Sequence, residues 1–469
     1  MGHKFDVISP IDESTVVTIQ EASPAQIERT LDQAQRSANT WRHTPIADRI
    51  AVIEGFVKHL EGRRDEIAQT ITMCMGRPSR WAGGEVTGTA ERARHMASIA
   101  EECLRDIQPT PTPGFDRFIR REALGVVLVL SPWNYPYLTA VNAVVPALLA
   151  GNSVVLKHSD QTPLAAEHFA EAFIAAGLPK GVFQILHMDH DATARVLGDD
   201  RIDHVAFTGS VSGGMAVNRA LSNRLGLKRF IGSGMELGGN DPAYVRADAN
   251  IAHAAANVIE GALFNSGQSC CGVERIYVHQ SIADDFIEAA ITEAHTYVLD
   301  DPRQPTTTLG PVVRQRNADG IRAQVSAAIA AGAIPLIGSE NWARDQPDTP
   351  YIRPQLLTKV DHTMDIMSEE TFGPCVGIMA VRDDAHAVEL MNDTAYGLTA
   401  SIWTPDQEAA LTIGNQLQTG TVFLNRCDYL DPALAWTGVK NSGRGVTLSR
   451  LGFDHLTRPK SFHFKTEIN

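Results

Sequence analysis

Short β-branched runs alternate with alanine-rich segments from about residue 118 onward, and this alternation limits the folds open to the chain. The clearest runs are Gly125–Leu130, Ser153–Leu156, Val182–Leu186 and His204–Phe207. Each run is followed by a segment whose apolar residues have helical spacing, which predicts βαβ units around a parallel sheet. We therefore expect a doubly wound, Rossmann-type domain whose ligand lies beyond the carboxyl ends of the strands.

The same pattern starts again after Gly238-Gly239 and continues to about Asn441. Its β-branched runs lie near Arg275–His279, Val376–Val381 and Thr421–Leu424. A chain of 469 residues is too long for one ordinary core, so a second α/β unit is expected. We predict a cofactor-binding domain over residues 1–238, without about 108–123, and a catalytic domain over residues 239–441.

Other segments have a simpler character. Ser23 to Met75 has helical spacing and predicts two surface helices, whereas Gln108–Gly114 contains three prolines and predicts an extended crossing. Phe453–Phe464 alternates like an edge strand, and such edges often pair with another subunit. We expect segments 108–123 and 453–469 to be oligomerisation strands of a homodimer or homotetramer.

Composition excludes several classes of protein. Hydrophobic residues at 43% and charged residues at 20% are typical of a globular chain. Acidic residues outnumber basic ones by 55 to 41, the formal charge is −14, and no long basic run occurs, so nucleic acid is not an expected partner.

Cysteine positions and apolar segments indicate the compartment. The six cysteines, at positions 74, 103, 270, 271, 375 and 427, lack the spacings of metal sites or disulfide scaffolds, so we expect free thiols and no metal. The first ten residues lack the apolar core of a signal peptide. Ala140–Ala150 is too short to cross a bilayer and contains Pro146. A cytoplasmic protein without a membrane partner is expected.

The segment Phe264–Gly272 contains the best candidate for a nucleophile, Cys270. A thiolate attacks carbonyl carbon well, and the pKa of a cysteine can be brought near neutrality by its surroundings. Gly267 lets backbone approach the thiol, and nearby N–H groups could hold an oxyanion. The alternative is that Cys270 is a small buried apolar residue.

Several short motifs occur in the order and spacing of one enzyme family. They are Ser131-Pro-Trp-Asn134, Phe207-Thr-Gly-Ser210, Met235-Glu-Leu-Gly-Gly239, Gly267-Gln-Ser-Cys270, Glu370-Thr-Phe-Gly-Pro374 and Asn425. Over nearly its whole length the chain resembles the aldehyde dehydrogenase superfamily of the non-acylating type. The resemblance implies an α/β fold with a Rossmann-type cofactor domain, an α/β catalytic domain and a small β oligomerisation extension. It also implies oxidation of an aldehyde to the carboxylic acid with NAD(P).

The resemblance assigns three catalytic residues. Cys270 would attack the aldehyde to form a thiohemiacetal, whose hydride passes to nicotinamide and leaves a thioester. Asn134, with the backbone N–H of Cys270, would form the oxyanion hole, although asparagine here also suits a turn. Glu236 would activate the water that hydrolyses the thioester, and its alternative is a solvated surface glutamate. Cys271 is expected to pack rather than react, because neighbouring side chains point in different directions.

Cofactor contacts are implied in the same way. Lys157 and Asp160 resemble the family's Lys-x-x-Glu pair for the adenosine ribose, with glutamate shortened to aspartate and the usual proline replaced by His158. Because a carboxylate there repels a 2′-phosphate, we expect NAD to be preferred over NADP. The other expected cofactor contacts, to the pyrophosphate and the nicotinamide half, are Gly209, Ser210, Gly214, Glu370, Phe372 and Trp133.

The substrate tunnel is expected to combine aromatic and polar side chains, namely Tyr135, Thr139, Asn142, Ser269, Cys271, Tyr429, Leu430 and Trp436. Aromatic walls favour an aryl or medium-sized aldehyde. No arginine stands at an expected lining position, so an ω-carboxylated semialdehyde has no evident partner. Arg426 is the nearest candidate.

Other functions stay open from the sequence. A coenzyme-A acylating relative generally has no base at the position of Glu236. A cofactor-independent thiol esterase would need only the thiol and the base. A catalytically idle protein that keeps the fold is a third alternative, against which the presence of Cys270, Glu236 and Asn134 argues.

Overall fold

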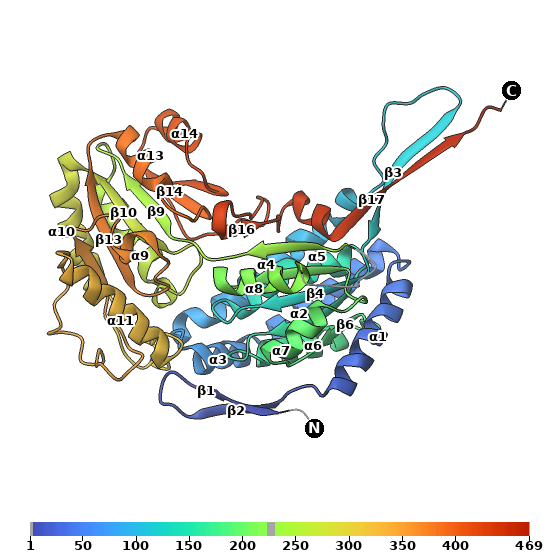
Figure 1. Ribbon diagram of the computed structural model, residues 1–469, viewed down its shortest axis with the longest axis horizontal. Coiled ribbons are helices and arrows are strands. Elements are labelled where there is room, and N and C mark those ends of the chain that lie inside the picture. The colour runs from blue at the N-terminus through green and yellow to red at the C-terminus, as the bar shows by residue number, and fades with distance from the viewer. Residues whose placement is uncertain (1–2, 223–229, 469) are drawn as a thin grey trace.

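The computed structural model describes residues 3–222 and 230–468, which form two large, mainly parallel sheets and two small antiparallel ones (Figure 1). Helices cover the large sheets. This arrangement confirms the predicted α/β fold with a Rossmann-type first unit.

The first large sheet has the strand order β16-β8-β7-β4-β5-β6. The four β-branched runs of the first unit are its strands β4, β5, β6 and β7, as predicted, and only β16 pairs antiparallel. Chain order reverses direction between β4 and β7, so the ligand crevice of this sheet is expected at their carboxyl ends. The strands are β4 (Val126–Ser131), β5 (Ser153–His158), β6 (Phe183–Ile185), β7 (His204–Thr208), β8 (Gly232–Glu236) and β16 (Gly443–Arg444).

Both faces of this sheet are buried. Strand β4 is buried throughout: Val127 and Val129 pack into one apolar cluster, and Val126 and Leu128 pack into another on the opposite face. Two-sided burial explains why the run is continuously apolar instead of alternating. The helices of the unit are α5 (Pro136–Leu149), α6 (Leu164–Ala175), α7 (His190–Leu197) and α8 (Val211–Ser222).

The N-terminal part adds a hairpin and four helices. Ser23 caps the first helix through a capping box with Gln26, and Pro24 occupies its first turn. The prediction of two helices between Ser23 and Met75 was wrong, because the second run breaks at Arg63 into two separate helices. The elements are β1 (Lys4–Ile8), β2 (Thr15–Gln20), α1 (Pro24–Trp41), α2 (Ile46–Gly62), α3 (Arg64–Met75) and α4 (Ser79–Leu104).

The second large sheet has the order β11-β12-β13-β10-β9-β14-β15. The chain passes to it from the first sheet between Glu236 and Asp241. Its strands are β9 (Asp241–Val245), β10 (Val273–His279), β11 (Ile334–Pro335), β12 (Gln355–Thr358), β13 (Cys375–Val381), β14 (Thr399–Trp403) and β15 (Thr421–Leu424). Its helices are α9 (Ile251–Leu263), α10 (Ala283–Ala294), α11 (Gln315–Ala330), α12 (Asp365–Ser368), α13 (Asp384–Asn392) and α14 (Gln407–Gly414).

A two-stranded arm projects from the body (Figure 1). It consists of β3 (Phe115–Ala123) and β17 (Thr457–Lys465), which pair antiparallel in continuous register. The terminal strand thus begins later than Phe453, which lies in a 3-10 helix, η4 (Arg450–Leu456). In the part of the chain described, no helix is long and apolar enough to cross a bilayer.

Candidate active site

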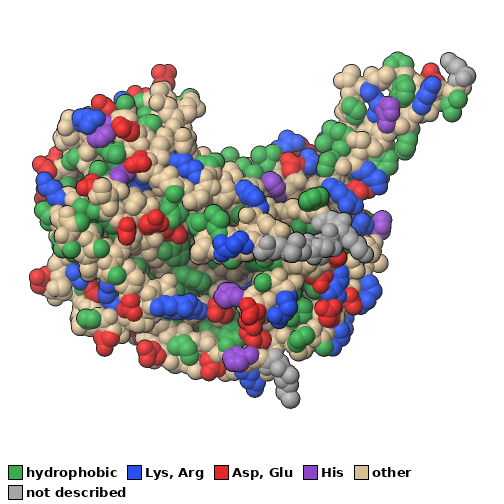
Figure 2. Space-filling model, in the orientation of Figure 1, with side chains coloured by type: hydrophobic (Ala, Val, Ile, Leu, Met, Phe, Trp, Pro, Cys, Tyr) green, Lys and Arg blue, Asp and Glu red, His purple; other side chains and the backbone are tan. Residues whose placement is uncertain are grey.

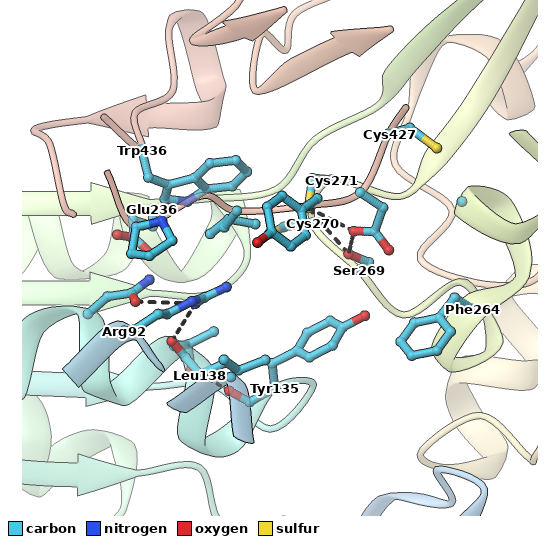
Figure 3. A pocket seen from close by; sticks show the side chains of 18 of the residues that line it. Arg92, Tyr135, Leu138, Glu236, Phe264, Ser269, Cys270, Cys271, Cys427 and Trp436 are labelled. Atoms are coloured by element: carbon cyan, nitrogen blue, oxygen red, sulfur yellow. Dashed lines mark hydrogen bonds between the residues drawn. The ribbon is translucent and has the colours of Figure 1, made fainter. Parts of the chain in front are cut away.

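A cavity of about 400 Å³ lies where the two large units meet (Figure 3). Helices α4, α5 and α9, the ends of β7 and β8, the loop before β10 and the segment after β15 all contribute to its wall. Cys270 and Glu236 both line it. So do all the tunnel residues expected from the sequence, namely Tyr135, Thr139, Asn142, Ser269, Cys271, Tyr429, Leu430 and Trp436.

Cys270 follows a strained turn. In the 3-10 helix η1 (Phe264–Gly267), Asn265 and Ser266 have φ of 55° and 58°, and Gly267 has φ of 68°. A Cβ on Gly267 would lie 2.0 Å from the carbonyl oxygen of Gly373, so only glycine fits. The turn directs the chain along the cavity and leaves the Cys270 side chain partly exposed within it.

The side-chain amide of Asn134 lies beside the nucleophile loop. Its Nδ2 donates to the carbonyl oxygen of Gln268 at 3.2 Å, two residues before Cys270. One amide hydrogen is thereby used, and the second has no hydrogen-bond partner among the described residues. The carbonyl oxygen of Asn134 accepts from Asn265 Nδ2 at 3.2 Å, so the two loops are hydrogen-bonded in both directions.

A buried ion pair supports both loops. Arg77 and Glu85 are 2% exposed each and bond to one another. Arg77 also donates to the carbonyl oxygen of Asn134 and, at 2.8 Å, to Asn265 Oδ1. The carboxylate of Glu85 accepts the backbone N–H of Tyr137 at 2.7 Å, at the N-terminus of α5. The sequence analysis did not identify this pair, since neither residue belongs to a motif.

Glu236 ends β8 and points into the cavity. One carboxylate oxygen accepts from the Thr447 hydroxyl, and the other accepts from the Thr208 hydroxyl at 3.2 Å. Burial raises the pKa of Glu236 above its ordinary value, whereas these hydroxyls and the positive charge of Arg92 oppose the rise. A carboxylate with a raised pKa is better matched to proton transfer near neutral pH.

Cys271 is held away from this chemistry. It is 3% exposed, and its Sγ donates to Asp428 Oδ1 at 3.0 Å. Ser269 donates to the same carboxylate oxygen at 2.9 Å. The neighbouring Cys270 side chain, burial and the Asp428 charge raise the pKa of Cys271 well above its usual range. Cys271 therefore remains a protonated thiol near neutral pH.

The expected cofactor residues lie together at the carboxyl edge of the first sheet. Trp133 and Asn134 follow β4, Lys157 lies near the end of β5 and Asp160 follows that strand, and Gly209 and Ser210 follow β7 at the start of α8. The Ser210 hydroxyl accepts the N–H of Gly213, and a Cβ on Gly214 would lie 2.6 Å from Leu237. A glycine-containing helix N-terminus at a sheet switch point fits a pyrophosphate.

The remaining cofactor residues lie at the junction with the second sheet. Glu370 accepts the backbone N–H of Gly239 at 2.9 Å. A Cβ on Gly238 would come within 2.3 Å of the Glu370 carboxylate, so glycine permits this approach. Phe372 packs edge-on against Trp133, with 5.6 Å between ring centroids. These contacts bring Glu370, Phe372 and Trp133 close together, where they could hold the nicotinamide half of a dinucleotide.

The structure corrects the expectation about arginines. Arg92 of helix α4 lines the cavity, although no lining arginine other than Arg426 was considered from the sequence. Arg426 also lines it but is exposed, with its guanidinium 3.7 Å from the ring centroid of Tyr429. Further lining residues that were not anticipated are Gly88, Glu91, Leu138, Asn257, Glu260, Phe264 and Asp428. Apart from Phe264, which begins the nucleophile segment, they lie on helices or loops without a motif.

Comparison with known proteins agrees with this geometry. The sequence profile of the aldehyde dehydrogenase family matches residues 1–462. The chain is 34% identical over 445 residues to the succinate semialdehyde dehydrogenase Sad of Escherichia coli (strain K12), covering 95% of this chain and 94% of that protein. It is also 34% identical to a probable NADP+ succinate-semialdehyde dehydrogenase of Synechocystis sp., covering 97% and 98%.

Solved structures are similar throughout. The crystal structure of an NAD-dependent aldehyde dehydrogenase from Sinorhizobium meliloti has a TM-score of 0.94 at 30% identity, covering 100% of this chain and 92% of that one. A succinic semialdehyde dehydrogenase from Streptococcus pyogenes, in complex with NADP+, has a TM-score of 0.93 at 28% identity, covering 98% and 100%.

Removing the positive charge of Arg77, which bonds the loops of Asn134 and Asn265, should lower the stability of the protein. Replacing Arg77 with methionine (Arg77→Met) leaves the Glu85 carboxylate unpaired, and we expect the free energy of unfolding to fall by about 3–5 kcal/mol. Urea unfolding followed by tryptophan fluorescence measures this change. Arg94→Met, which breaks an exposed ion pair between helix α4 and Glu61 of helix α2, is the control and should cost less than about 1 kcal/mol. Equal losses in the two variants would contradict the role assigned to Arg77.

Proposed function

The chain belongs to the aldehyde dehydrogenase family and is an NAD(P)-dependent aldehyde dehydrogenase, and from this premise we propose that Cys270, Glu236 and Asn134 carry out the oxidation. The observation that carries the proposal is that the thiol and the carboxylate line one cavity. The amide of Asn134 is hydrogen-bonded to the loop that presents the thiol.

The first step is attack of the Cys270 thiolate on the aldehyde carbon. A C–S bond forms, the carbonyl π electrons move to oxygen, and the product is a thiohemiacetal oxyanion. Asn134 Nδ2 and the backbone N–H of Cys270 donate to this oxygen, and each such donor lowers a barrier by about 3–4 kcal/mol. A nicotinamide dinucleotide held near Glu370, Phe372 and Trp133 would accept the hydride from the former aldehyde carbon, which would leave the acyl group on Cys270 as a thioester.

The second step is hydrolysis of the thioester. Glu236 takes a proton from water as the water oxygen adds to the acyl carbon, and collapse of the adduct breaks the C–S bond and releases the acid. Thr447 and Thr208 hold the Glu236 carboxylate in the cavity. Because Glu236 generates the water nucleophile, the product is a free acid and not a coenzyme-A ester.

Two substitutions separate the steps. Cys270→Ala should abolish NADH formation, because no thiohemiacetal can form. Glu236→Gln should keep a burst of about one NADH per site and lose steady-state turnover by about 10²–10⁴-fold. Stopped-flow absorbance of NADH measures both phases with a panel of aldehydes.

The control for this experiment is Cys103→Ala, which removes a buried thiol at the end of helix α4 and should retain both phases. Full turnover in Cys270→Ala would overturn the proposed nucleophile. Full turnover in Glu236→Gln would overturn the proposed base.

The pH dependence of thioester hydrolysis should change when Thr447 is replaced, on the acid side of the pH–rate profile. The Thr447 hydroxyl stabilises the ionised carboxylate of Glu236, so Thr447→Val should raise the pKa of Glu236 further. More of the base is then protonated at a given pH, and the acid limb of the steady-state rate moves to higher pH. Rates measured from pH 5.5 to 9 test this shift. Thr292→Val, on the exposed surface of α10, is the control, and an unchanged or lower limb in Thr447→Val would contradict the proposal.

For the cofactor we infer that NAD is preferred over NADP. Burial raises the pKa of Asp160, but Arg314 and Lys157 outweigh it, so the net pKa lies below its ordinary value and the group is ionised near neutral pH. An ionised carboxylate at the adenosine ribose repels a 2′-phosphate. Arg314, 3.3 Å from Asp160, offsets part of this repulsion, and similar proteins include ones named for NADP+ and one named as NAD-dependent.

Asp160→Ser tests this preference through binding. Quenching of tryptophan fluorescence by NAD+ and NADP+ measures the two dissociation constants without turnover. We expect the ratio of the NADP+ constant to the NAD+ constant to fall by about tenfold or more, corresponding to about 1.4 kcal/mol. Asp361→Asn, at an exposed carboxylate of the second unit, should leave the ratio unchanged. Tighter binding of NADP+ than of NAD+ by the unsubstituted protein would refute the preference.

The arm is the proposed oligomerisation element, and a homodimer or homotetramer is the proposed assembly. Apolar side chains gather on the arm and at its base (Figure 2), and the exposed ones include Ile107, Phe115 and Phe464. An exposed two-stranded ribbon with aromatic side chains is typical of a subunit contact. The division into a cofactor domain (1–238, without about 108–123) and a catalytic domain (239–441), and a cytoplasmic location suggested by the six free cysteines, remain parts of this proposal.

A further inference from the structure

Among the described residues, three arginine side chains are buried, and they differ in the groups that accept their hydrogen bonds. Arg77 pairs with Glu85 and bonds two further oxygens. Arg275 donates to backbone carbonyl oxygens of Asn240, Leu390 and Met391 and to a tyrosine hydroxyl. Arg92 has neither arrangement, although it is only 9% exposed.

Only one nitrogen of Arg92 has a partner within residues 3–222 and 230–468. Its Nη1 donates to the carbonyl oxygen of Leu138 at 2.8 Å and to Asn142 Oδ1 at 3.2 Å. No carboxylate of the described chain lies within 4.0 Å of the guanidinium, so Glu236 and Arg92 share the cavity without forming an ion pair. A buried cation without a counterion is costly unless an anion comes to it.

The guanidinium points into the substrate cavity. Figure 3 shows Arg92 reaching from helix α4 toward the space that Glu236 and Cys270 also face. Its Nε and Nη2 are the free donors, and Arg92 remains charged at any physiological pH. Because Asn142 uses Oδ1 to accept from Arg92, its Nδ2 is oriented as a further donor on the same wall.

We propose that Arg92, oriented by Asn142, binds the distal carboxylate of the substrate, so that the preferred substrates are short semialdehydes. This inference rests on the proposed function, since it places the aldehyde end at Cys270. A guanidinium with two adjacent free N–H groups matches the two oxygens of a carboxylate. The cavity of about 400 Å³ accommodates a small substrate.

Among anions, the other charged groups of the cavity disfavour a dianion more than a monoanion. Glu91, Glu236, Glu260 and Asp428 also line the cavity, and they would repel a phosphate dianion more strongly than a single carboxylate. Arg426 is a weaker anchor because it is exposed and already stacks on Tyr429. Arg92 is therefore the buried cationic group of the cavity wall that retains unpaired donors among the described residues, and Asn142 lies beside it.

The test compares two four-carbon aldehydes that differ only in the distal group, 4-oxobutanoate and butanal. The unsubstituted enzyme should have the higher kcat/KM for 4-oxobutanoate. Arg92→Met keeps much of the side-chain length and removes the charge. We expect it to lower the ratio of kcat/KM for 4-oxobutanoate to that for butanal by about 10–100-fold, mainly through KM, because charged hydrogen bonds are lost. Arg92→Lys should restore part of the ratio.

Controls separate this role from others. Arg94→Met, on the exposed face of the same helix, should leave the ratio unchanged. Quenching of tryptophan fluorescence by NAD+ verifies that each variant is folded. If Arg92→Met lowers kcat/KM for both aldehydes equally and moves the acid limb of the rate, Arg92 acts through Glu236, and the carboxylate subsite is refuted.

The outcomes also distinguish the two proposals. If the unsubstituted enzyme oxidises butanal as well as or better than 4-oxobutanoate, the subsite is wrong while the proposed function stands. If neither aldehyde, nor any of a wider aldehyde panel, is oxidised with NAD+ or NADP+, both proposals fail.

Discussion

The Arg77–Glu85 ion pair holds together the groups on which the site depends. A buried ion pair rarely repays its desolvation in stability alone, so its value lies in the partners that it places. Glu85 accepts the first N–H groups of helix α5, where an anion is favoured by the helix dipole. Arg77 bonds the carbonyl oxygen of Asn134 and the side chain of Asn265. One charged pair thereby connects a strand end of the first sheet to the nucleophile loop of the second.

The nucleophile loop is strained in a way that the surrounding packing sustains. Asn265 and Ser266 adopt left-handed backbone, which costs of order 1–3 kcal/mol per residue and persists only where the surroundings enforce it. Asn265 Nδ2 bonds the carbonyl oxygens of Asn134 and Gln268, and Gly267 packs against Gly373 without a side chain. Strain at this turn, balanced by these bonds, sets the position of Cys270 relative to the Asn134 amide.

The polar side chains of the cavity differ in whether they have hydrogen-bond partners within the protein. This difference separates the groups that serve the reaction from the group that we propose selects the substrate. Glu236 is bonded to two threonine hydroxyls and Cys271 to Asp428, so their protons and charges have partners within the protein. Arg92 retains unpaired donors. Glu236 and Cys271 have hydrogen-bond partners within the protein and serve the reaction and the packing. Arg92 keeps free N–H donors, to which a ligand can bind.

Local patterns and the family motifs predicted the strands and many lining residues of the cavity, but contacts made by residues outside those motifs were not predicted. The run Gly125–Leu130 indicates its strand through a continuous apolar series rich in β-branched valine. The motifs around Cys270 and Glu236 indicated the family and its chemistry through their residue types and their order along the chain. Arg77, Glu85 and Arg92 lie on or next to helix α4, where periodicity shows an amphipathic helix but not what its buried face meets. The sequence by itself determined the α/β class and the candidate nucleophile and base. Only the tertiary structure decided which charges are paired and which face the cavity, because the distance between two side chains on different segments depends on how those segments pack.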